Sequence, residues 1–391
     1  MQSAIAPSLS YPVRQPTLFD AYPPDSQLCI SVVIPARNEA DHLESTLDAL
    51  RNQRQINGVP VPISEYEVLL LLNNCTDQSV AIGQRYQRLH PTFPLRIASV
   101  QLPPEKANVG TARRLLMDAA YRRLIQVNRP QGIIASTDGD TIVDRYWLAH
   151  IQAEIANGCE AVGGRILTRP DGNPVRVNHL RDVTYRMLKA CVEAQLDPLT
   201  FDPWPRHFQH FGASLALTCA AYRRVGGLPH VPHLEDEALY QALLRTDTPI
   251  RKSPHVRVTT STRLHGRVEV GFSEQLRYWD AMNQAHRCQL VEAAGAIIQR
   301  LQSRRQLRTY WQRTHIPNSA ALQPIADELM LDVDWLRDQV DQSRYFGQLW
   351  EAVETQLTTG KWATYWKPVP ITTAIHELRR FLRTVRSVQP A

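Results

Sequence analysis

Short apolar runs alternate with amphipathic segments through the first third of the chain. Four runs have the length and composition of buried strands: Cys29–Ile34, Glu67–Leu72, Leu95–Val100 and Ile133–Ala135. Segments with helical spacing of apolar residues follow the first three runs, near residues 40–51, 78–88 and 111–126. This alternation predicts an α/β fold with parallel strands, right-handed crossovers and a ligand crevice along the carboxyl edge of the sheet.

The alternation weakens after residue 140. Further helices are predicted at Trp147–Asn157, Arg176–Gln195 and His233–Arg245, and further strands at Glu160–Leu167 and Val256–Ser261. Phe211–Ala221 is predicted as a strand that opens into a helix. From Ser273 the pattern is helical to the end, and one helical stripe is formed by Leu329, Val333, Leu336 and Val340. We therefore divide the chain into a Pro-rich arm at 1–27, an α/β domain at 28–270 and a helical region at 271–391.

The composition is that of an ordinary globular protein, with 391 residues, 43% hydrophobic and 21% charged. The formal net charge is +6, and only five of the 44 basic residues are lysines. Arginine suits bidentate contacts to phosphate or carboxylate, so the basic excess fits an anionic substrate, an acidic membrane surface or a nucleic acid. No basic run is interleaved with aromatic residues, so we do not expect nucleic-acid binding.

The cysteines and the amino terminus bear on the compartment. Six cysteines are scattered without a CxxC pair, which favours buried, reduced thiols. The first 25 residues lack a basic start followed by an apolar core, so they do not resemble a signal peptide. No stretch approaches the ~20 apolar residues of a membrane span. These features predict a cytoplasmic protein.

Two carboxylates follow the fourth apolar run, in Asp138-Gly139-Asp140. They alternate in a tight loop at the carboxyl end of a predicted strand, where they repel each other unless a positive charge lies between them. Mg²⁺ and Mn²⁺ prefer hard oxygen ligands and leave positions open for substrate phosphate. The alternative is a solvated Asp-Gly turn.

The loops after the other three strands are also polar. Together they carry a mixture that suits a nucleotide, with amides and carboxylates for base and ribose and cations for phosphate: Arg37, Glu39, Asn73, Asn74, Asp77, Lys106 and Arg113.

Four motifs in this order resemble family 2 glycosyltransferases of the GT-A fold. Pro35–Glu39 is similar to their P-x-x-N-E start, and Thr137–Asp140 to their D-x-D metal loop. Gly212–Ser214, followed by Val225–Leu228, is similar to their acceptor-side segment, and Leu234–Glu237 to their E-D motif. The resemblance covers about residues 28–270.

The resemblance implies a doubly wound mixed sheet of the GT-A type, with a helical C-terminal extension, and a metal-dependent enzyme. Its donor would be a nucleotide-diphosphate sugar, with UDP- or GDP-sugars expected, and the anomeric centre would be inverted. Asp236 would be the general base beside Glu235, and Asp140 would bind Mn²⁺ or Mg²⁺. Donor-binding positions would be Pro35, Arg37, Glu39, Asn73, Asp77, Lys106, Arg113 and Asp138, with Asp138 at the ribose or sugar.

Two motifs depart from the family pattern. The second loop usually reads D-D-G-S-T-D and here reads Leu72–Asp77, L-N-N-C-T-D, which leaves the nucleotide base open because an amide both donates and accepts. Processive members carry Q-x-x-R-W, whereas Gln275–Trp279 has these residues at other offsets. We therefore expect a non-processive enzyme.

Two charged clusters have a structural and a functional interpretation. Glu235–Glu237 opens a predicted helix, where carboxylates are favoured, but three in a row also repel and raise the proton affinity of one of them, which suits a base. Arg263 and Arg267 could neutralise a leaving diphosphate, and His265 between them could complete a metal shell. The alternative for this second cluster is a solvated basic turn.

Two further segments also allow two interpretations. Trp204 and His207 stand in a run of aromatic, proline and histidine residues that forms either an acceptor wall near Gly212 or a core corner. A last helix has one apolar stripe and arginines elsewhere, so it either packs on its own domain or rests on anionic lipid. Packing is favoured. The stripe is Ile375, Leu378, Leu382 and Val385, and the arginines are Arg379, Arg380, Arg383 and Arg386.

Two other functions fit fewer of these motifs. A sugar-phosphate nucleotidyltransferase would need a Gly-rich loop after the first strand, and Pro35–Glu39 contains no glycine. A non-catalytic sugar-nucleotide-binding module would not need the Glu235-Asp236 pair. A glycosyltransferase accounts for more of the motifs than either alternative.

Overall fold

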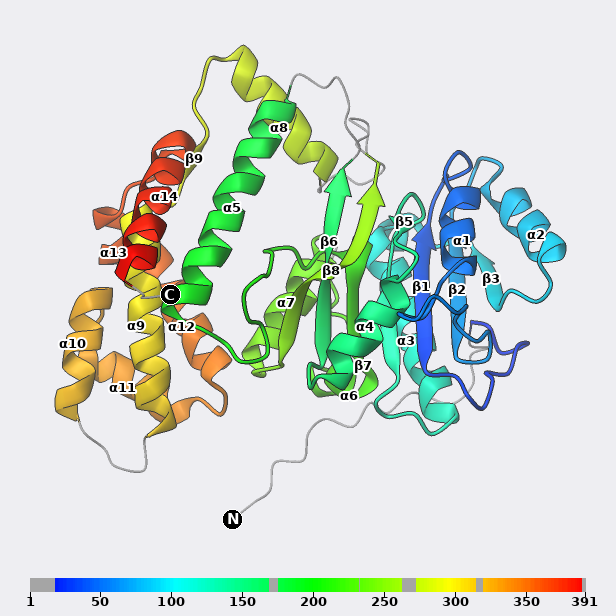
Figure 1. Ribbon diagram of the computed structural model, residues 1–391, viewed down its shortest axis with the longest axis horizontal. Coiled ribbons are helices and arrows are strands. Elements are labelled where there is room, and N and C mark those ends of the chain that lie inside the picture. The colour runs from blue at the N-terminus through cyan, green and yellow to red at the C-terminus, as the bar shows by residue number, and fades with distance from the viewer. Residues whose placement is uncertain (1–17, 169–174, 232, 262–271, 314–318, 389–391) are drawn as a thin grey trace. The chain divides into compact units, whose positions relative to one another are not determined.

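The computed structural model describes residues 18–168, 175–231, 233–261, 272–313 and 319–388 (Figure 1). The chain divides into two compact units that are interleaved along the sequence. Unit 1 contains the described residues up to Ile155, with Phe211–Leu239 and Val258–Thr260. Unit 2 contains Ala156–His210, Tyr240–Arg257 and the described residues from Ser261 onward. The predicted boundary at residue 270 lies outside the described residues and stays a prediction.

Four parallel strands form the centre of unit 1, in the order β3-β2-β1-β4. They are β1 (Ile30–Ala36), β2 (Tyr66–Asn73), β3 (Leu95–Val100) and β4 (Ile133–Ser136). Every residue of β1, β2 and β4 is buried, which is why these strands read as continuous apolar runs rather than as alternating ones. The parallel strands predicted from the sequence are confirmed.

Helices connect these strands: α1 (Leu43–Arg51), α2 (Ser79–Leu89) and α3 (Val109–Gln126), with a short 3-10 turn η1 (Pro104–Lys106) before α3. The apolar face of α1 is buried, because Leu43, Leu47 and Leu50 all have no exposed surface. The amino end of α3 is capped by Asn108, whose side chain accepts the Thr111 N–H at 2.8 Å.

Beyond β4 the sheet of unit 1 becomes mixed. Strand β7 (Leu215–Thr218) pairs antiparallel with β4, and the short β5 (Ile142–Val143) pairs antiparallel with the end of β8 (Ile250–Thr260). This confirms the predicted mixed α/β sheet. The remaining elements around these strands are η2 (Gly212–Ser214), α4 (Trp147–Ala156), α6 (Cys219–Arg224) and α7 (Glu235–Arg245).

Unit 2 contains β6 (Ala161–Thr168), which neighbours β8, and the long helix α5 (Arg176–Leu196). Its C-terminal part is helical, as predicted, except that β9 (Leu290–Val291) pairs antiparallel with β10 (Val369–Pro370). Strands of two residues leave no periodic signal in a sequence. The helices are α8 (Phe272–Gln284), α9 (Ala294–Gln312), α10 (Ser319–Leu329), α11 (Val333–Gln342), α12 (Phe346–Thr359), α13 (Lys361–Tyr365) and α14 (Ile371–Val388).

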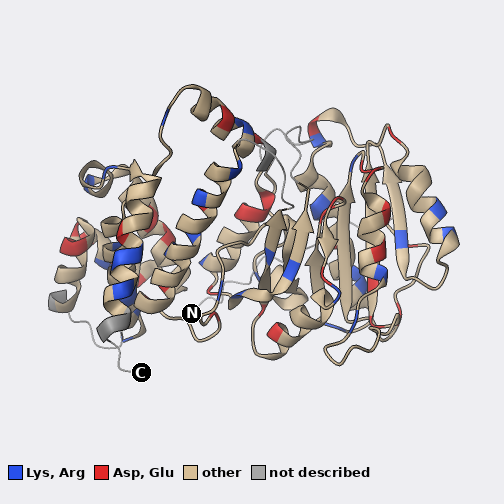
Figure 2. Cartoon of the chain, turned by 45° about the horizontal axis from the view of Figure 1, so that its top comes forward, with Lys and Arg blue, Asp and Glu red and all other residues tan. Residues whose placement is uncertain are grey.

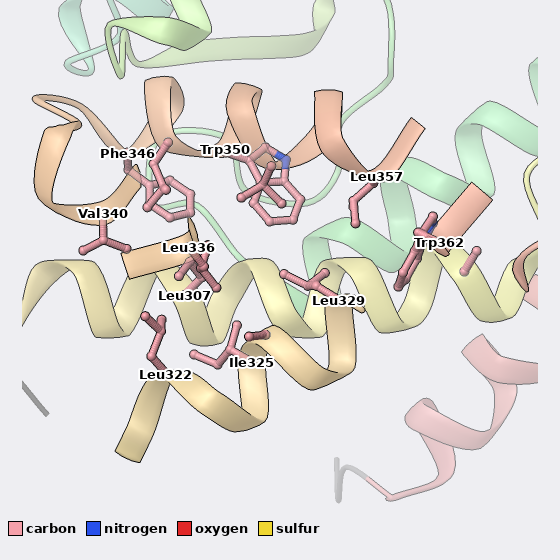
Figure 3. Close-up of a cluster of buried hydrophobic side chains, with 14 of the residues drawn as sticks. Leu307, Leu322, Ile325, Leu329, Leu336, Val340, Phe346, Trp350, Leu357 and Trp362 are labelled. Atoms are coloured by element: carbon pink, nitrogen blue, oxygen red, sulfur yellow. The ribbon is translucent and has the colours of Figure 1, made fainter. Parts of the chain in front are cut away.

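A hydrophobic core holds α9 to α12 together (Figure 3). The predicted single stripe from Leu329 to Val340 is wrong, because α10 ends at Leu329 and α11 begins at Val333. Met330 takes a positive φ of 57° and Asp332 caps α11 by accepting the Trp335 N–H at 2.9 Å. Both helices still bury apolar residues in the same core. The spacing therefore predicted correctly that these residues are buried, and wrongly that they lie on one continuous helix.

Two predictions about the ends of the chain meet the structure in part. Most of the Pro-rich arm lies outside the described residues, but Arg123 Nη1 donates to the carbonyl oxygens of Phe19 and Tyr22, at 3.3 and 2.6 Å. Arg123 in turn pairs with the buried Glu67 at 2.6 Å. In the described parts of the chain, none of the helices has the length and hydropathy needed to cross a membrane.

Candidate active site

Polar residues gather at the carboxyl edge of the parallel strands in unit 1. The loops after β1 to β4 carry the predicted donor and metal positions, because parallel strands all deliver their carboxyl ends to one edge. Two further segments of unit 1, η2 and the first turn of α7, bring Gly212, Glu235 and Asp236.

The loops after β1 and β2 are tied to each other by side chains. Asn38, with φ 57°, accepts the Thr76 N–H at 2.7 Å through its Oδ1. The Asp77 carboxylate accepts the Ala40 N–H at 3.1 Å and the Ser79 N–H at 2.9 Å. Asp77, predicted to bind the donor, therefore holds two loops in register, and Asn38 is a contributor that the donor-site prediction left out.

Four other predicted donor positions at this edge differ in exposure. Arg37 is exposed and donates to the Ala107 carbonyl at 3.2 Å, and Lys106 is exposed at the end of η1. Asn73, the last residue of β2, is 3% exposed. Pro35 is buried within β1, so it shapes the backbone before the loop. The structure thus keeps two cations and one buried amide on the same sheet edge.

Arg113 is the residue that joins the separate motifs. It is 4% exposed, and its guanidinium donates to groups from four segments. Nε donates to Glu235 Oε1 at 3.0 Å and Nη2 to Asp138 Oδ1 at 2.9 Å. Nη1 donates to Ser136 Oγ at 2.5 Å and to the Gly212 carbonyl at 3.2 Å. Arg113 was predicted to contact the donor, and the contacts described here are all to protein groups.

The charges in this cluster alter proton affinities. Burial alone would lower the pKa of Arg113, but the carboxylates of Asp138 and Glu235 outweigh it and raise that pKa above its usual value. Burial raises the pKa of Asp138; Arg113 opposes this effect, and the neighbouring Asp140 carboxylate adds to it. One guanidinium therefore does not neutralise the carboxylates around it.

The adjacent acids of the E-D motif have different surroundings. Glu235 is 4% exposed and its carboxylate is paired with Arg113. Asp236 is partly exposed; its Oδ2 accepts the Gly212 N–H at 2.8 Å and its Oδ1 accepts the Glu237 N–H at 2.8 Å. Both backbone donors fix the Asp236 carboxylate while leaving it partly open to solvent. Glu235, predicted to be catalytic beside Asp236, is enclosed by protein.

Gly212 is required by close packing. A Cβ atom at this position would lie 2.6 Å from Arg113 Cζ, closer than atoms approach without a shift. The D-x-D loop is also confined, since a Cβ on Gly139 would lie 3.0 Å from Ala36 Cβ and the Gly139 carbonyl accepts the Thr46 hydroxyl at 3.1 Å. Both carboxylates of that loop, Asp138 and Asp140, stay partly exposed.

A comparison with known protein families decides the assignment of this region. Residues 31–215 match the family model described as Glycosyl transferase family 2. Residues 31–215 form a family 2 glycosyltransferase domain. The matched stretch includes Pro35–Glu39 and Thr137–Asp140, two of the motifs on which the resemblance rests, and the mixed α/β sheet that they implied is present.

Among sequence relatives, the glycosyltransferase AglE of Haloferax volcanii is 27% identical over 147 residues. The match spans 37% of this chain and 41% of AglE, which is less than half of that relative's length.

Solved structures that match this chain at low similarity include the following three. The mannosyltransferase PcManGT of Pyrobaculum calidifontis, in complex with GDP-Man and Mn²⁺, is 15% identical with a TM-score of 0.44 and covers 94% of this chain and 90% of its own. S. aureus TarS 1–349 with UDP-GlcNAc is 15% identical with a TM-score of 0.44, covering 84% and 91%. Glucosyl-3-phosphoglycerate synthase of Mycobacterium tuberculosis, with Mn²⁺, UDP and glucosyl-3-phosphoglycerate, is 18% identical with a TM-score of 0.36, covering 68% and 86%.

The predicted third metal ligand and the predicted diphosphate contacts fall on residues that the structure does not describe. His265, Arg263 and Arg267 lie outside the described residues and stay predictions. Among the residues that the structure does describe, no group of three or more histidine, cysteine or acidic side chains is arranged to hold a metal ion.

The predicted acceptor residues Trp204 and His207 belong to unit 2. Trp204 is 44% exposed, whereas His207 is 2% exposed. The His207 ring contacts the Ser253 carbonyl through Nε2 at 3.0 Å and accepts the Gln209 N–H through Nδ1 at 3.0 Å. Burial lowers the pKa of His207 to about 3, so the ring is neutral and joins two backbone segments. An acceptor contact by Trp204 stays a prediction.

Proposed function

We propose that the family 2 domain transfers a sugar from a nucleotide-diphosphate donor to an acceptor hydroxyl, with inversion of the anomeric centre. The observation that carries this proposal is the fixed, partly exposed carboxylate of Asp236. It accepts backbone hydrogen bonds from Gly212 and Glu237, and it lies in the same cluster as the D-x-D carboxylate Asp138 through Arg113. A base must be held near its substrate and still be reachable, and Asp236 meets both conditions.

The reaction is a single displacement. The acceptor oxygen attacks the anomeric carbon and forms the new glycosidic bond as its proton passes to Asp236. The bond between the anomeric carbon and the diphosphate oxygen breaks, and the nucleoside diphosphate leaves with that electron pair. Attack from the face opposite the leaving group inverts the configuration at the anomeric carbon.

Glu235 and Arg113 are positioning residues in this proposal. The Glu235 carboxylate is used by Arg113, whose other donors hold Asp138, Ser136 and Gly212. Arg113 thereby holds the loop of Asp138 and the segment that carries the proposed general base Asp236 in fixed positions. Preorganised positions of this kind lower the barrier because little rearrangement is needed during the reaction.

A divalent cation, Mn²⁺ or Mg²⁺, fits the charge of the cluster. Asp138, Asp140, Glu235 and Asp236 contribute four carboxylates, and the buried guanidinium of Arg113 offsets one charge. Asp140 would hold the cation, with Asp138 toward the ribose or sugar and His265 as the candidate further ligand. When bound, such a cation supplies charge stabilisation for the departing diphosphate.

The donor is proposed to be a UDP- or GDP-sugar. Asn73 would face the base, since its amide can donate and accept, and Arg37 and Glu39 would lie beside the base and ribose. Lys106 is an exposed cation suited to phosphate. Arg263 and Arg267 are proposed as further diphosphate contacts.

The test is Asp236→Asn, measured as nucleoside diphosphate release from a panel of UDP-, GDP-, ADP- and dTDP-sugars with Mn²⁺. We expect turnover to fall ~10²–10⁴-fold while the thermal shift caused by the donor is kept, because the amide cannot accept the proton. Asp334→Asn, a solvent-facing aspartate of α11, is the matched control and keeps full turnover. Full turnover by Asp236→Asn would remove Asp236 from the role, and a wild-type protein that turns over none of the donors would favour a binding module.

A further inference from the structure

The last helix of unit 2, α14, has two faces of opposite character. Its apolar residues are buried in a core shared with α5 and α9: Ile371, Ala374, Ile375, Leu378 and Leu382. They are unavailable for insertion into a bilayer while α14 is docked in that core. The packing predicted for this helix is therefore present.

The exposed face of α14 carries a stripe of cations. His376, Arg379, Arg380 and Arg383 are all exposed and follow the spacing i, i+3, i+4, i+7, which places them on one side of a helix (blue for the arginines in Figure 2). We call these four residues the basic stripe. The helix contains a single acid, Glu377. Like charges at this spacing oppose helix formation, so the stripe is unfavourable for the isolated fold.

Two arginines of the neighbouring helix α9, by contrast, form ion pairs. On the neighbouring helix α9, Arg300 pairs with Glu292 and Glu354, and Arg304 pairs with Glu193 and Asp197. In the described part of the chain, none of the three arginines of the basic stripe has an ion-pair partner. The three arginines of the basic stripe thus differ from Arg300 and Arg304, whose charges are compensated by carboxylates.

We propose that the basic stripe docks the protein on an anionic membrane surface through lipid phosphates. Several arginines near an anionic lipid surface are each attracted to it, and these attractions add without a fitted binding pocket. The basic stripe contains such a row of arginines, on a helix whose apolar face is already buried in the protein core. Exposed Leu290 lies on β9, which pairs with β10 directly before α14, and exposed Tyr365 is the last residue of α13. Leucine and tyrosine side chains of this kind favour a membrane interface.

A nucleic acid is the less favoured occupant. The stripe contains no phenylalanine, tyrosine or tryptophan for base stacking, because Phe381 packs against the core of α14, and it contains no amide for reading base edges. This inference does not depend on the proposed transfer reaction, since it rests on α14 alone.

The test is co-sedimentation of the full chain with phosphatidylcholine vesicles, with and without phosphatidylglycerol. We expect binding to the anionic vesicles that weakens with salt, and a loss of about 100-fold in partitioning for the triple variant Arg379→Glu, Arg380→Glu, Arg383→Glu. The triple lysine variant at the same positions should retain binding, because the attraction is to charge. Circular dichroism and thermal melting check that each variant is folded.

The matched control reverses three exposed arginines of unit 1, Arg88, Arg129 and Arg145, which changes the net charge by the same amount. We expect this control to bind the anionic vesicles as the wild type does. Equal loss in both triple variants, no preference of the wild type for anionic vesicles, or tighter binding to a duplex oligonucleotide than to vesicles would each overturn the proposal.

Discussion

Buried arginines organise both units of this protein, but the charge balance around them is opposite. In unit 1, Arg113 lies among the carboxylates of the D-x-D and E-D motifs. In unit 2, the carboxylate of Glu193 lies between Arg206 and Arg304, at 2.5 and 2.6 Å. The first cluster has more acids than arginines, and the second surrounds an acid with arginines.

The pKa shifts of the acids follow this difference. Burial raises the pKa of Asp138, and Arg113 does not compensate because Asp140 stands beside it. Burial would also raise the pKa of Glu193, but Arg304 and Arg206 outweigh it and hold that pKa well below its usual value. A saturated network stabilises structure, whereas a cluster with unneutralised carboxylates is suited to bind a cation or accept a proton.

The largest change we expect comes from Arg113→Met. Removing the guanidinium leaves the buried carboxylate of Glu235 and the partly exposed carboxylate of Asp138 without this partner, which should cost ~3–5 kcal/mol in the free energy of unfolding, together with nearly all transfer activity. Denaturant unfolding and donor turnover measure the two effects. A loss below ~1 kcal/mol would show that the site does not depend on Arg113 and would break the comparison.

A smaller change tests the same group without removing charge. Gly212→Ala places a Cβ against Arg113 Cζ, so the guanidinium must move and we expect a cost of ~1–3 kcal/mol and a lower turnover. Gly83→Ala on α2 is the control, because its Cβ would meet neighbours at an ordinary 3.5 Å. That substitution should be neutral or stabilise by ~0.5–1 kcal/mol. Equal effects of the two alanines on turnover would contradict the role of Gly212.

The network of unit 2 predicts a dependence on pH. Because the pKa of Glu193 is lowered in the folded protein, its stabilisation is complete above the usual carboxyl value of 4.5 and is lost as the pH falls through the lowered value. In Glu193→Gln we expect lower stability near neutral pH and a weaker dependence on acid, measured as denaturant midpoints between about pH 6 and about pH 3. Curves that stay parallel to the wild type would rule out this contribution.

The smallest effect is expected for an exposed ion pair that belongs to neither of the two buried clusters. Asp334 and Arg337 form an exposed pair on α11 at 2.7 Å, with 76% and 41% of their side chains exposed. Asp334→Asn should change the free energy of unfolding by only ~0.2–0.5 kcal/mol, because solvent screens the pair. A change in the free energy of unfolding as large as that of Gly212→Ala would mean that ion pairing itself, rather than burial and charge balance, determines how strongly a charged residue affects stability.

Much of the fold could be predicted from local pattern. The buried strands of unit 1 appear in the sequence as apolar runs, and the position of the polar residues after each run places them on one edge of a parallel sheet. The antiparallel direction of β7 and the two-residue strands β9 and β10 could not be predicted in this way. Their partners are distant in the chain, and their lengths are too short for a period to appear.

The sequence by itself determined which residue types stand at the site: Asp138 and Asp140 after a buried strand, and Glu235-Asp236 at the start of a helix. Only the tertiary structure decided which of these residues is enclosed by protein and which stays open to solvent. Arg113 meets Glu235 across 122 positions of the chain, and this contact buries one acid of an adjacent pair while Gly212 holds the other. Neighbouring residues have the same local sequence context, so their roles separate only when distant segments pack against them.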